Sequence, residues 1–272
     1  MKWYFFKTLR EKRSILKKLK RGEVVPFIKY VLYRFRLSSL FRLKRRRYTM
    51  RVFYSPFAFW LWTHEGAEKE EEMFFESFLK EGDIVVDCGA HIGTLTITAS
   101  RIVGEKGKVF AYEAHPRTFS YLKRNTEDND CRNVLLKNVA IGKKKGVVSF
   151  SDYYASDLNS VEDVGKFLVE METLDHLLKD VGIISLLKLD IEGSELPALL
   201  GAREVLKRTR AVYFESAERS FKRFGYALDD IVVFLNDNGF TCYLTSKDGL
   251  LQEVQRGHVT KMRYENIVAL AD

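Results

Sequence analysis

Proline and cysteine are both scarce in this sequence, and their scarcity bears on the class of protein. Only four prolines occur in 272 residues, and glycine is moderate at 17, so long disordered linkers are not expected. The three cysteines, Cys88, Cys131 and Cys242, lie far apart, and no C-x-x-C pair occurs. This pattern gives no sign of a zinc ribbon or a disulfide framework, and it fits a reducing cytosol. We expect Cys88 to be a small core residue.

Long apolar runs are also missing. Nowhere do about 18 apolar residues follow one another without a charge, so a membrane-spanning helix is not expected. The hydrophobic content of 46% and charged content of 30% are ordinary for a globular protein. A chain of this length can form one large α/β domain with an appendage.

Acidic residues are nearly absent from the first part of the chain. Residues 1–50 hold 17 Lys and Arg but only Glu11 and Glu23, a net charge of +15 within a chain of net charge +8. The remainder is therefore mildly acidic, at −7. We expect a basic amphipathic arm over residues 1–47 and a Rossmann-like domain over residues 48–272.

Three interpretations of the basic arm remain open. Residues 1–21 and a second segment from Phe27 to Arg42 place apolar side chains at three- and four-residue steps among Lys and Arg, which predicts amphipathic helices. The arm could lie on an anionic membrane, pack on the domain as a cap, or bind RNA phosphates. We favour the membrane surface over nucleic acid, which would place a cytoplasmic protein at the inner membrane face.

From residue 84 onward, strand-like apolar runs alternate with helix-like apolar periods. The pattern predicts a doubly wound, mostly parallel sheet of the α/β class, preceded by a helix over residues 65–80. Residues 48–66 are rich in aromatics and are expected to form short strands or a loop. The expected strands are the run ending at Asp87 and residues 108–113, 134–142, 147–150 (antiparallel), 185–190, 211–215, 240–244 and 266–270. The expected helices include residues 116–129 and 229–238 and segments that begin near residues 95 and 195.

A glycine turn follows the first of these strands. Gly89 and Gly93 allow a tight turn and close approach of a ligand, because glycine has no Cβ. The helix that follows points its free N–H groups over the turn, as in a nucleotide-type cofactor site. The Gly-x-Gly-x-x-Gly fingerprint is absent, which favours a cofactor without pyrophosphate.

An acid at the end of the second strand adds to this site. Glu113 follows Asp87 by 26 residues, close to the spacing of about 20 between a glycine-rich turn and its ribose-binding acid. We favour Glu113 as the acceptor of hydrogen bonds from both ribose hydroxyls. The alternative is a structural one, in which Glu113 caps the helix that begins at Pro116.

Five motifs follow one another in the chain: Val86–Gly93, Glu113–Pro116, Asn138–Gly142, Thr173–Asp175 and Leu187–Glu195. Together they resemble the FkbM family of S-adenosylmethionine-dependent methyltransferases, a class I family. The similarity covers roughly residues 65–245 and is most specific in the Lys-x-Asp-x-Glu-Gly-x-Glu block that begins at Lys188. His91 and His115 stand where Asn is common in that family.

The resemblance implies roles for individual residues. The family's cofactor is S-adenosyl-L-methionine, and the family is chiefly associated with O-methylation of sugars, polyketides and related hydroxyl compounds. Asp190 would lie near the sulfonium and the acceptor, with Glu192 beside it. The residues implied at the cofactor are Gly89, Ala90 and Gly93 at the methionine end, Glu113 at the ribose, Asn138, Val139 and Ala140 at the adenine, and also Asp87, His91, Thr94 and Asp190.

A hydroxyl acceptor must lose a proton, which a nearby carboxylate can take. Asp190 is the first candidate base, and Glu192 and His91 follow; structurally, the two acids could instead serve a strand end and a helix N-terminus. Asp190, Glu192 and Glu215 could hold a divalent ion, although we expect no metal. Lys188, on a buried strand, requires a carboxylate partner.

The expected function is therefore methylation of a hydroxyl on a glycan or lipid-linked acceptor at a membrane surface. RNA methylation is the enzymatic alternative, but no aromatic–Pro–Pro–aromatic motif of amino-group methylation follows a strand. The other alternative is a binding module of the same fold that does not catalyse transfer.

Overall fold

The computed structural model describes residues 24–152, 160–161, 165–216, 218–245, 251–254 and 265–272. These residues fall into two compact units, one ending at Glu68 and one beginning at Lys69. The helix expected over residues 1–21 lies outside the described residues. The expected division between residues 47 and 48 falls inside the first unit, between the strands of a hairpin, and that division stays a prediction.

The first unit is a small helical unit with one hairpin. Its elements are α2 (Val24–Arg34), the 3-10 helix η1 (Leu37–Leu40), β1 (Arg42–Lys44), β2 (Thr49–Arg51) and α3 (Pro56–Thr63). Strand β1 pairs antiparallel with β2. The sequence did not predict α3, which begins in a standard way: the Ser55 side chain accepts the Ala58 N–H, and Pro56 opens the first turn. None of the helices that the structure describes is long and apolar enough to cross a membrane.

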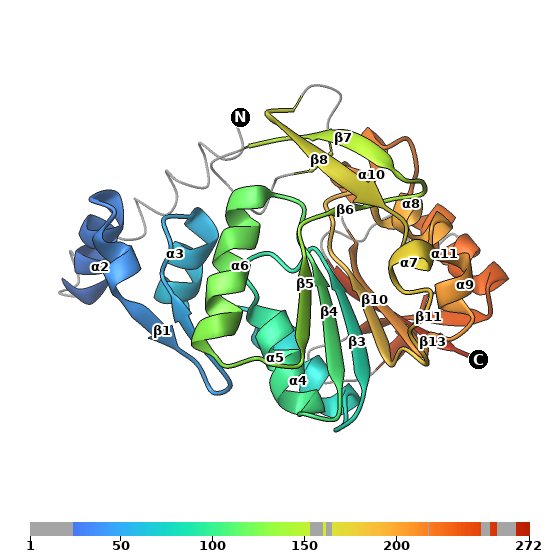
Figure 1. Ribbon diagram of the computed structural model, residues 1–272, viewed down its shortest axis with the longest axis horizontal. Helices are drawn as coiled ribbons and strands as arrows, with labels where there is room; N and C mark the ends of the chain where they lie inside the picture. The colour runs from blue at the N-terminus through green and yellow to red at the C-terminus, as the bar shows by residue number, and fades with distance from the viewer. Residues whose placement is uncertain (1–23, 153–159, 162–164, 217, 246–250, 255–264) are drawn as a thin grey trace. The chain divides into compact units, whose positions relative to one another are not determined.

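The second unit is organised around a large sheet (Figure 1). Among the described residues, eight strands lie in the order β12-β11-β13-β10-β9-β3-β4-β5. Strands β5, β4, β3, β9 and β10 run parallel, while β13 is antiparallel to both β10 and β11. The predicted doubly wound, mostly parallel α/β fold is therefore confirmed. The strands are β3 (Ile84–Cys88), β4 (Lys108–Tyr112), β5 (Val134–Lys137), β9 (Leu186–Leu189), β10 (Ala211–Ser216), β11 (Phe240–Thr245), β12 (Leu251–Glu253) and β13 (Glu265–Ala271).

Alternate strand residues point to opposite faces of the sheet. Side chains are buried on both faces, and helices cover both. Val85 packs on the side of α4 (Lys69–Phe78) and α5 (Thr94–Val103), and α6 (Pro116–Asp128) adds Leu122 against Ala111. Val86 packs on the opposite side, in the cluster that the second set of helices completes. That set comprises α7 (Leu174–Leu177), α8 (Glu195–Leu200), α9 (Arg203–Leu206) and α11 (Leu228–Asp237), and α10 (Glu218–Arg223) precedes α11.

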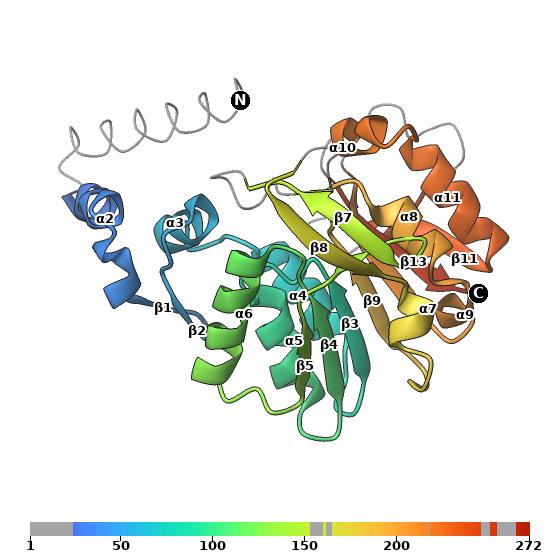
Figure 2. The same ribbon diagram turned by 45° about the horizontal axis from the view of Figure 1, so that its top comes forward.

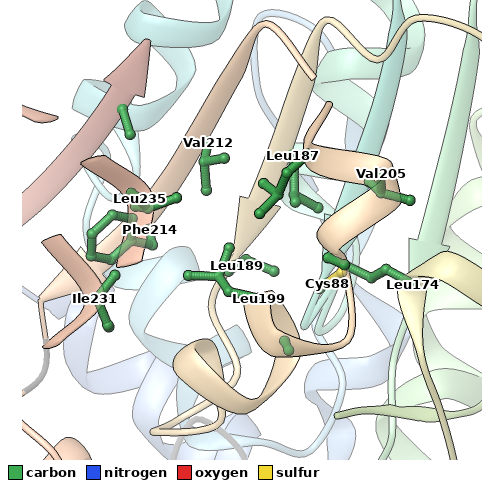
Figure 3. Close-up of a cluster of buried hydrophobic side chains, with 14 of the residues drawn as sticks. Cys88, Leu174, Leu187, Leu189, Leu199, Val205, Val212, Phe214, Ile231 and Leu235 are labelled. Atoms are coloured by element: carbon green, nitrogen blue, oxygen red, sulfur yellow. The ribbon is translucent and has the colours of Figure 1, made fainter. Parts of the chain in front are cut away.

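Figure 3 shows the core on the second face, where strand side chains meet helix side chains. Phe214 of β10 lies against Ile231 and Leu235 of α11, and all three are fully buried. Cys88 is also fully buried, as its position next to the first strand predicted. Burial on both faces fixes the strands, so that the loops at their carboxyl ends start from a rigid base.

A three-stranded sheet lies at the end of the central sheet where β5 finishes (Figures 1 and 2). It contains β6 (Ala140–Ile141), β8 (Phe167–Glu172) and β7 (Gly146–Phe150), in that order. Strand β7 pairs antiparallel with β8, as predicted for that segment. The single strand predicted over residues 134–142 is wrong. The chain leaves the central sheet at Asn138, whose side-chain amide donates to the carbonyls of Glu113 and Ala114 at 2.7 and 2.8 Å.

Candidate active site

The glycine turn after β3 is packed against the loop after β9. The N–H groups of Gly89 and Ala90 both donate to the Tyr112 carbonyl, at 2.9 and 3.0 Å. Gly89 has a φ of +78°, and a Cβ at this position would lie 1.8 Å from the Asp190 carbonyl oxygen. Only glycine therefore fits here, and it allows the turn after β3 to pack against the backbone that follows β9.

Two more residues of the turn, His91 and Gly93, are left-handed. His91 has a φ of +50°, and Gly93, the N-cap of α5, has a φ of +98°. Asn, Asp and His are enriched among non-glycine residues in this conformation. His91 therefore satisfies the same backbone requirement as the Asn that is common at this position. Thr94 is buried as the first residue of α5, and the Gly93 N–H donates to the Ala90 carbonyl at 2.9 Å.

Glu113 links the glycine turn to the start of α6. Its Oε2 accepts the His91 N–H at 2.9 Å, and its Oε1 accepts the His115 N–H at 2.8 Å. Burial raises the pKa of this carboxyl to about 7, although both backbone N–H groups oppose the rise. The structural contact at the helix start is thus present, and each carboxylate oxygen keeps a lone pair for another donor.

His115 is a second residue whose local role is visible. Its Nδ1 accepts the Thr118 N–H at 3.4 Å as the N-cap of α6, a role for which Asn is also preferred. Nε2 therefore carries the proton and donates to Asp152 Oδ1 at 3.2 Å. Burial lowers the pKa of this imidazole, more than its bond to Asp152 raises it.

Asp152 was not predicted from the sequence. Its buried carboxylate also accepts bonds from Arg117 at 3.0 Å and Lys166 at 2.5 Å. Burial alone would raise the pKa of Asp152, but the bonds from Lys166 and His115 and the charge of Arg117 lower it overall. The carboxylate thereby fixes the ring of His115, whose backbone N–H holds Glu113.

A buried ion pair lies beneath the turn. Lys188 Nζ lies 3.0 Å from Asp87 Oδ1, and both side chains are at most 5% exposed. Asp87 Oδ2 accepts the Thr96 hydroxyl at 2.5 Å, and Lys188 also lies 3.6 Å from Asp190 Oδ2. The expectation that Lys188 needs a carboxylate partner is confirmed. The pair joins β3 to β9 across their register, in which Asp87 lies opposite Lys188.

The loop after β9 holds the candidate base. The Asp190 N–H donates to the Cys88 carbonyl at 3.0 Å, while its side chain is 45% exposed. Glu192 has a φ of +53°, and its Oε2 lies 3.5 Å from the Ser220 hydroxyl of α10. Arg223 donates to the Glu192 carbonyl at 2.8 Å. Asp190 thus lies at the glycine turn, while Glu192 reaches toward α10.

Glu195 supports this loop from below. Its Oε1 accepts the Ile191 N–H at 3.0 Å, and the Tyr226 hydroxyl lies 3.3 Å from its Oε2 and donates to the Gly193 carbonyl at 2.8 Å. Burial raises the pKa of Glu195 to about 7, and the negative charge of Asp190 adds to the rise. The sequence motif contains Glu195 but gave it no role.

Glu215 is the neighbour of Asp190 on the next strand. Leu189 of β9 lies opposite Phe214 of β10 in the parallel register, so Asp190 and Glu215 follow side by side. Burial, and then the charge of Asp190, raise the pKa of Glu215 well above its ordinary value. Across the part of the chain that the structure describes, no group of three or more His, Cys, Asp or Glu could hold a metal ion.

The three residues expected at the adenine follow β5. The Asn138 side-chain amide donates to the carbonyls of Glu113 and Ala114, and the Val139 N–H donates to the Glu113 carbonyl at 3.2 Å. Val139 and Ala140 are buried in hydrophobic clusters. The structure therefore ties this segment to Glu113, and its role at the adenine stays a prediction, as do the other cofactor roles.

The chain is similar to several methyltransferases. It is 29% identical over 140 residues to the hexuronic acid methyltransferase AglP of Haloferax volcanii, which covers 50% of this chain and 56% of that protein. It is 26% identical over 147 residues to methyltransferase 1 of Beauveria bassiana, covering 44% and 59%. The chain thus spans a little over half the length of these two relatives.

A solved structure and a family model complete the comparison. Methyltransferase FkbM from Methylobacillus flagellatus has 18% identity and a TM-score of 0.46, over 92% of this chain and 60% of that one. The model of the methyltransferase FkbM domain matches residues 87–242, which is more than half of the chain. The matched region begins at Asp87 and includes Glu113, Asp190 and Glu215. On this match, the chain belongs to the FkbM methyltransferase family.

Proposed function

We propose that the protein is an S-adenosylmethionine-dependent O-methyltransferase that methylates a hydroxyl group of a glycan or glycolipid. The observation that carries the proposal is the half-exposed Asp190 carboxylate at the glycine turn, at the carboxyl edge of the sheet. The name of the relative AglP supports a sugar as the acceptor, since that protein is a hexuronic acid methyltransferase.

The residues at this edge suit the proposed cofactor. A cofactor with a ribose and no phosphate needs a hydrogen-bond acceptor for its hydroxyls, and Glu113 offers lone pairs on a carboxylate held by two backbone bonds. The turn at Gly89 leaves backbone where side chains would otherwise stand. The cofactor would be held by Gly89, Ala90, Gly93 and Glu113, and its adenine would lie against Asn138 to Ala140.

Asp190 would act on the acceptor. S-adenosylmethionine supplies, when bound, an electrophilic methyl group on a sulfonium, and transfer to oxygen needs positioning more than covalent help. A hydroxyl acceptor loses its proton as the carbon–oxygen bond forms, and Asp190 Oδ takes that proton. Lys188, at 3.6 Å, holds the carboxylate in place from below.

Asp190→Asn tests this role. If the acceptor is a hydroxyl, we expect kcat to fall by about 100-fold or more with donor affinity unchanged, since a general base contributes roughly 10²–10⁴. The assay is methyl transfer from labelled S-adenosylmethionine to uronic-acid-containing glycans. Asp180→Asn, an exposed acid elsewhere in the domain, is the control and should be unchanged. Full turnover in Asp190→Asn would reject Asp190 as the base. If Glu192→Gln also kept full turnover, the acceptor would be a group that needs no base, such as a sugar carboxylate.

The pH dependence of donor binding tests Glu113. Its raised pKa means that the folded free protein binds this proton up to about pH 7, so this carboxyl's contribution to stability is lost as pH rises from 4.5 toward about 7. Ribose hydroxyls bond better to the ionised form, so we expect affinity to rise by roughly tenfold between about pH 6 and pH 8, with proton release. Titration calorimetry in two buffers of different ionisation enthalpy measures both effects.

Glu113→Gln is the comparison for that experiment. An amide does not titrate, so the variant should show no proton release and a flat pH profile, with weaker binding throughout. The carboxyls of Glu195 and Glu215, whose pKa values are also raised, are unchanged in this variant and act as the internal control. If Glu113→Gln keeps the pH profile and the affinity of the parent, the ribose assignment is wrong.

We further propose that residues 1–47 bind an anionic membrane surface and that the acceptor reaches the active site from this surface. The support is the net charge of +15 over residues 1–50, interleaved with apolar side chains. A lipid-linked glycan would be presented there.

A further inference from the structure

Most of the described part of the first unit is basic, and its acids, Glu65 and Glu68, come only at its end. Residues 24–64 contain nine Lys and Arg and neither Asp nor Glu. Segments of this kind attract anionic surfaces, by roughly fivefold in affinity for each cation at a membrane. Charge alone does not distinguish lipid from RNA, so the placement of apolar side chains decides between them.

Four large apolar side chains are exposed at one turn of this unit. The chain reverses after α2, where Arg36 adopts a left-handed φ of 59° and leads into η1. Phe35 and Leu40 are 73% and 78% exposed, and Leu37 and Phe41 are 45% and 41% exposed. We call residues 34–42 the apolar turn; the exposed side chains of Arg34, Arg36 and Arg42 flank its apolar residues.

The apolar turn is built on a packed base. Tyr33, just before it, is buried and stacks on Tyr54 and Phe59 with ring centroids 4.9 and 4.6 Å apart. The Arg36 guanidinium lies over the Tyr54 ring at 4.9 Å, and the Phe41 ring lies 5.5 Å from that of Trp62.

Backbone bonds complete this base. The Phe41 N–H donates to the Ser38 carbonyl at 2.9 Å, and the Val52 N–H donates to the Phe41 carbonyl at 3.2 Å. The turn is therefore preformed: Phe35 and Leu40 stay exposed, while Tyr33 and Ser38 are buried beneath them.

We propose that the apolar turn docks on an anionic membrane, with Phe35, Leu37, Leu40 and Phe41 at the acyl boundary and Arg34, Arg36 and Arg42 among lipid phosphates. Aliphatic Leu37 and Leu40 gain from leaving water for an apolar phase, whereas RNA would reward stacking aromatics and leave them exposed. The inference rests on the proposed function for the presence of a lipid-linked acceptor. It places the contact in residues 34–42 and not only in the segment before Val24.

The test is sedimentation of the full chain with vesicles of phosphatidylcholine alone and with about one third phosphatidylglycerol. We expect binding to the anionic vesicles and little to the neutral ones. Phe35→Ser/Leu40→Ser should weaken binding by at least roughly tenfold, because two apolar side chains no longer insert. Arg34→Gln/Arg36→Gln should weaken it by a similar factor and reduce its salt dependence.

The matched control is Val147→Ser/Leu168→Ser in β7 and β8, where the two side chains are 64% and 78% exposed. This pair should leave vesicle binding unchanged. The proposal is overturned if Phe35→Ser/Leu40→Ser binds anionic vesicles as well as the parent does. It is also overturned if no form binds vesicles but the parent binds a poly-uridine RNA and the arginine variant does not.

Donor binding by calorimetry on the same samples separates this proposal from the proposed function. Variants that bind S-adenosylmethionine normally but lose the vesicles support membrane docking and show an intact domain. A parent that binds vesicles without binding the donor refutes the methyltransferase proposal and leaves the docking surface standing.

Discussion

Gly89→Ala is expected to weaken donor binding by at least about 100-fold relative to the parent. Two costs add at this position. A left-handed φ of +78° costs an alanine roughly 1–2 kcal/mol, and a Cβ only 1.8 Å from the Asp190 carbonyl oxygen forces the loops after β3 and β9 apart. Overpacking of this kind costs about 1–3 kcal/mol more. Urea unfolding measures the loss of stability, and titration calorimetry measures the loss of donor affinity.

Gly239→Ala is the matched control for backbone conformation. Gly239 has a φ of +79°, and a Cβ there would meet nothing within 4 Å. Its loss of stability should therefore stay near 1–2 kcal/mol, roughly the left-handed cost alone, with donor affinity unchanged. If both variants lose stability equally and Gly89→Ala still binds the donor, the close approach of the turn to Asp190 has no functional weight.

Lys188→Met is expected to destabilise the fold by about 3–5 kcal/mol, the typical result of leaving one member of a buried ion pair without its partner. Asp87 is 1% exposed, and Lys188 is the cation that reaches its Oδ1 at 3.0 Å. Methionine has nearly the shape of the lysine stem, so packing changes little and the uncompensated charge dominates. The free energy of unfolding in urea gives the magnitude.

The double variant Asp87→Asn/Lys188→Met isolates the charge effect. Asparagine still accepts the Thr96 hydroxyl, which now bonds to Asp87 at 2.5 Å, but it carries no charge. We expect the double variant to recover at least half of the loss, because a neutral pair needs no counter-ion. Lys207→Met, which removes an exposed pair with Glu204, should cost less than about 1 kcal/mol. A double variant no more stable than Lys188→Met would mean that packing, not charge, sets the cost.

Local patterns in the sequence were enough to predict the mostly parallel sheet and to propose a candidate site at its edge. The run ending at Asp87, the glycines at 89 and 93 and the acid at 113 each belong to one strand or turn, so their placement depends on short stretches of chain. The same holds for Lys188, whose burial on a strand required an acid. The two histidines in place of Asn also have local reasons, a left-handed backbone at 91 and a helix cap at 115.

Contacts between distant residues could not be predicted in this way. Asp152 meets His115 across 37 residues, and Tyr226 reaches Glu195 across 31, with no pattern in the chain linking them. The break of the strand at Asn138 depends on its amide meeting Glu113 and Ala114, 25 and 24 residues earlier. Helix α3 was the opposite case, because Ser55-Pro56 is a helix-start pattern that an aromatic-rich segment concealed.

One of the family motifs has a structural explanation. Thr173 caps α7 by accepting the His176 N–H at 3.2 Å. Asp175 Oδ1 accepts the N–H groups of Glu204 and Val205, at 3.0 and 2.9 Å, at the start of α9. These residues tie helices to the domain and have no direct part in the proposed chemistry.

A crystal structure of the full chain grown with S-adenosylhomocysteine tests the central claim most directly. The account predicts the ribose hydroxyls within hydrogen-bond distance of Glu113, the amino-acid end over the turn from Gly89 to Gly93, and Asp190 facing the sulfur. Density for the ligand away from the carboxyl ends of β3 and β4, or Glu113 bonded only to the backbone of His91 and His115 while the ligand binds elsewhere, would contradict it.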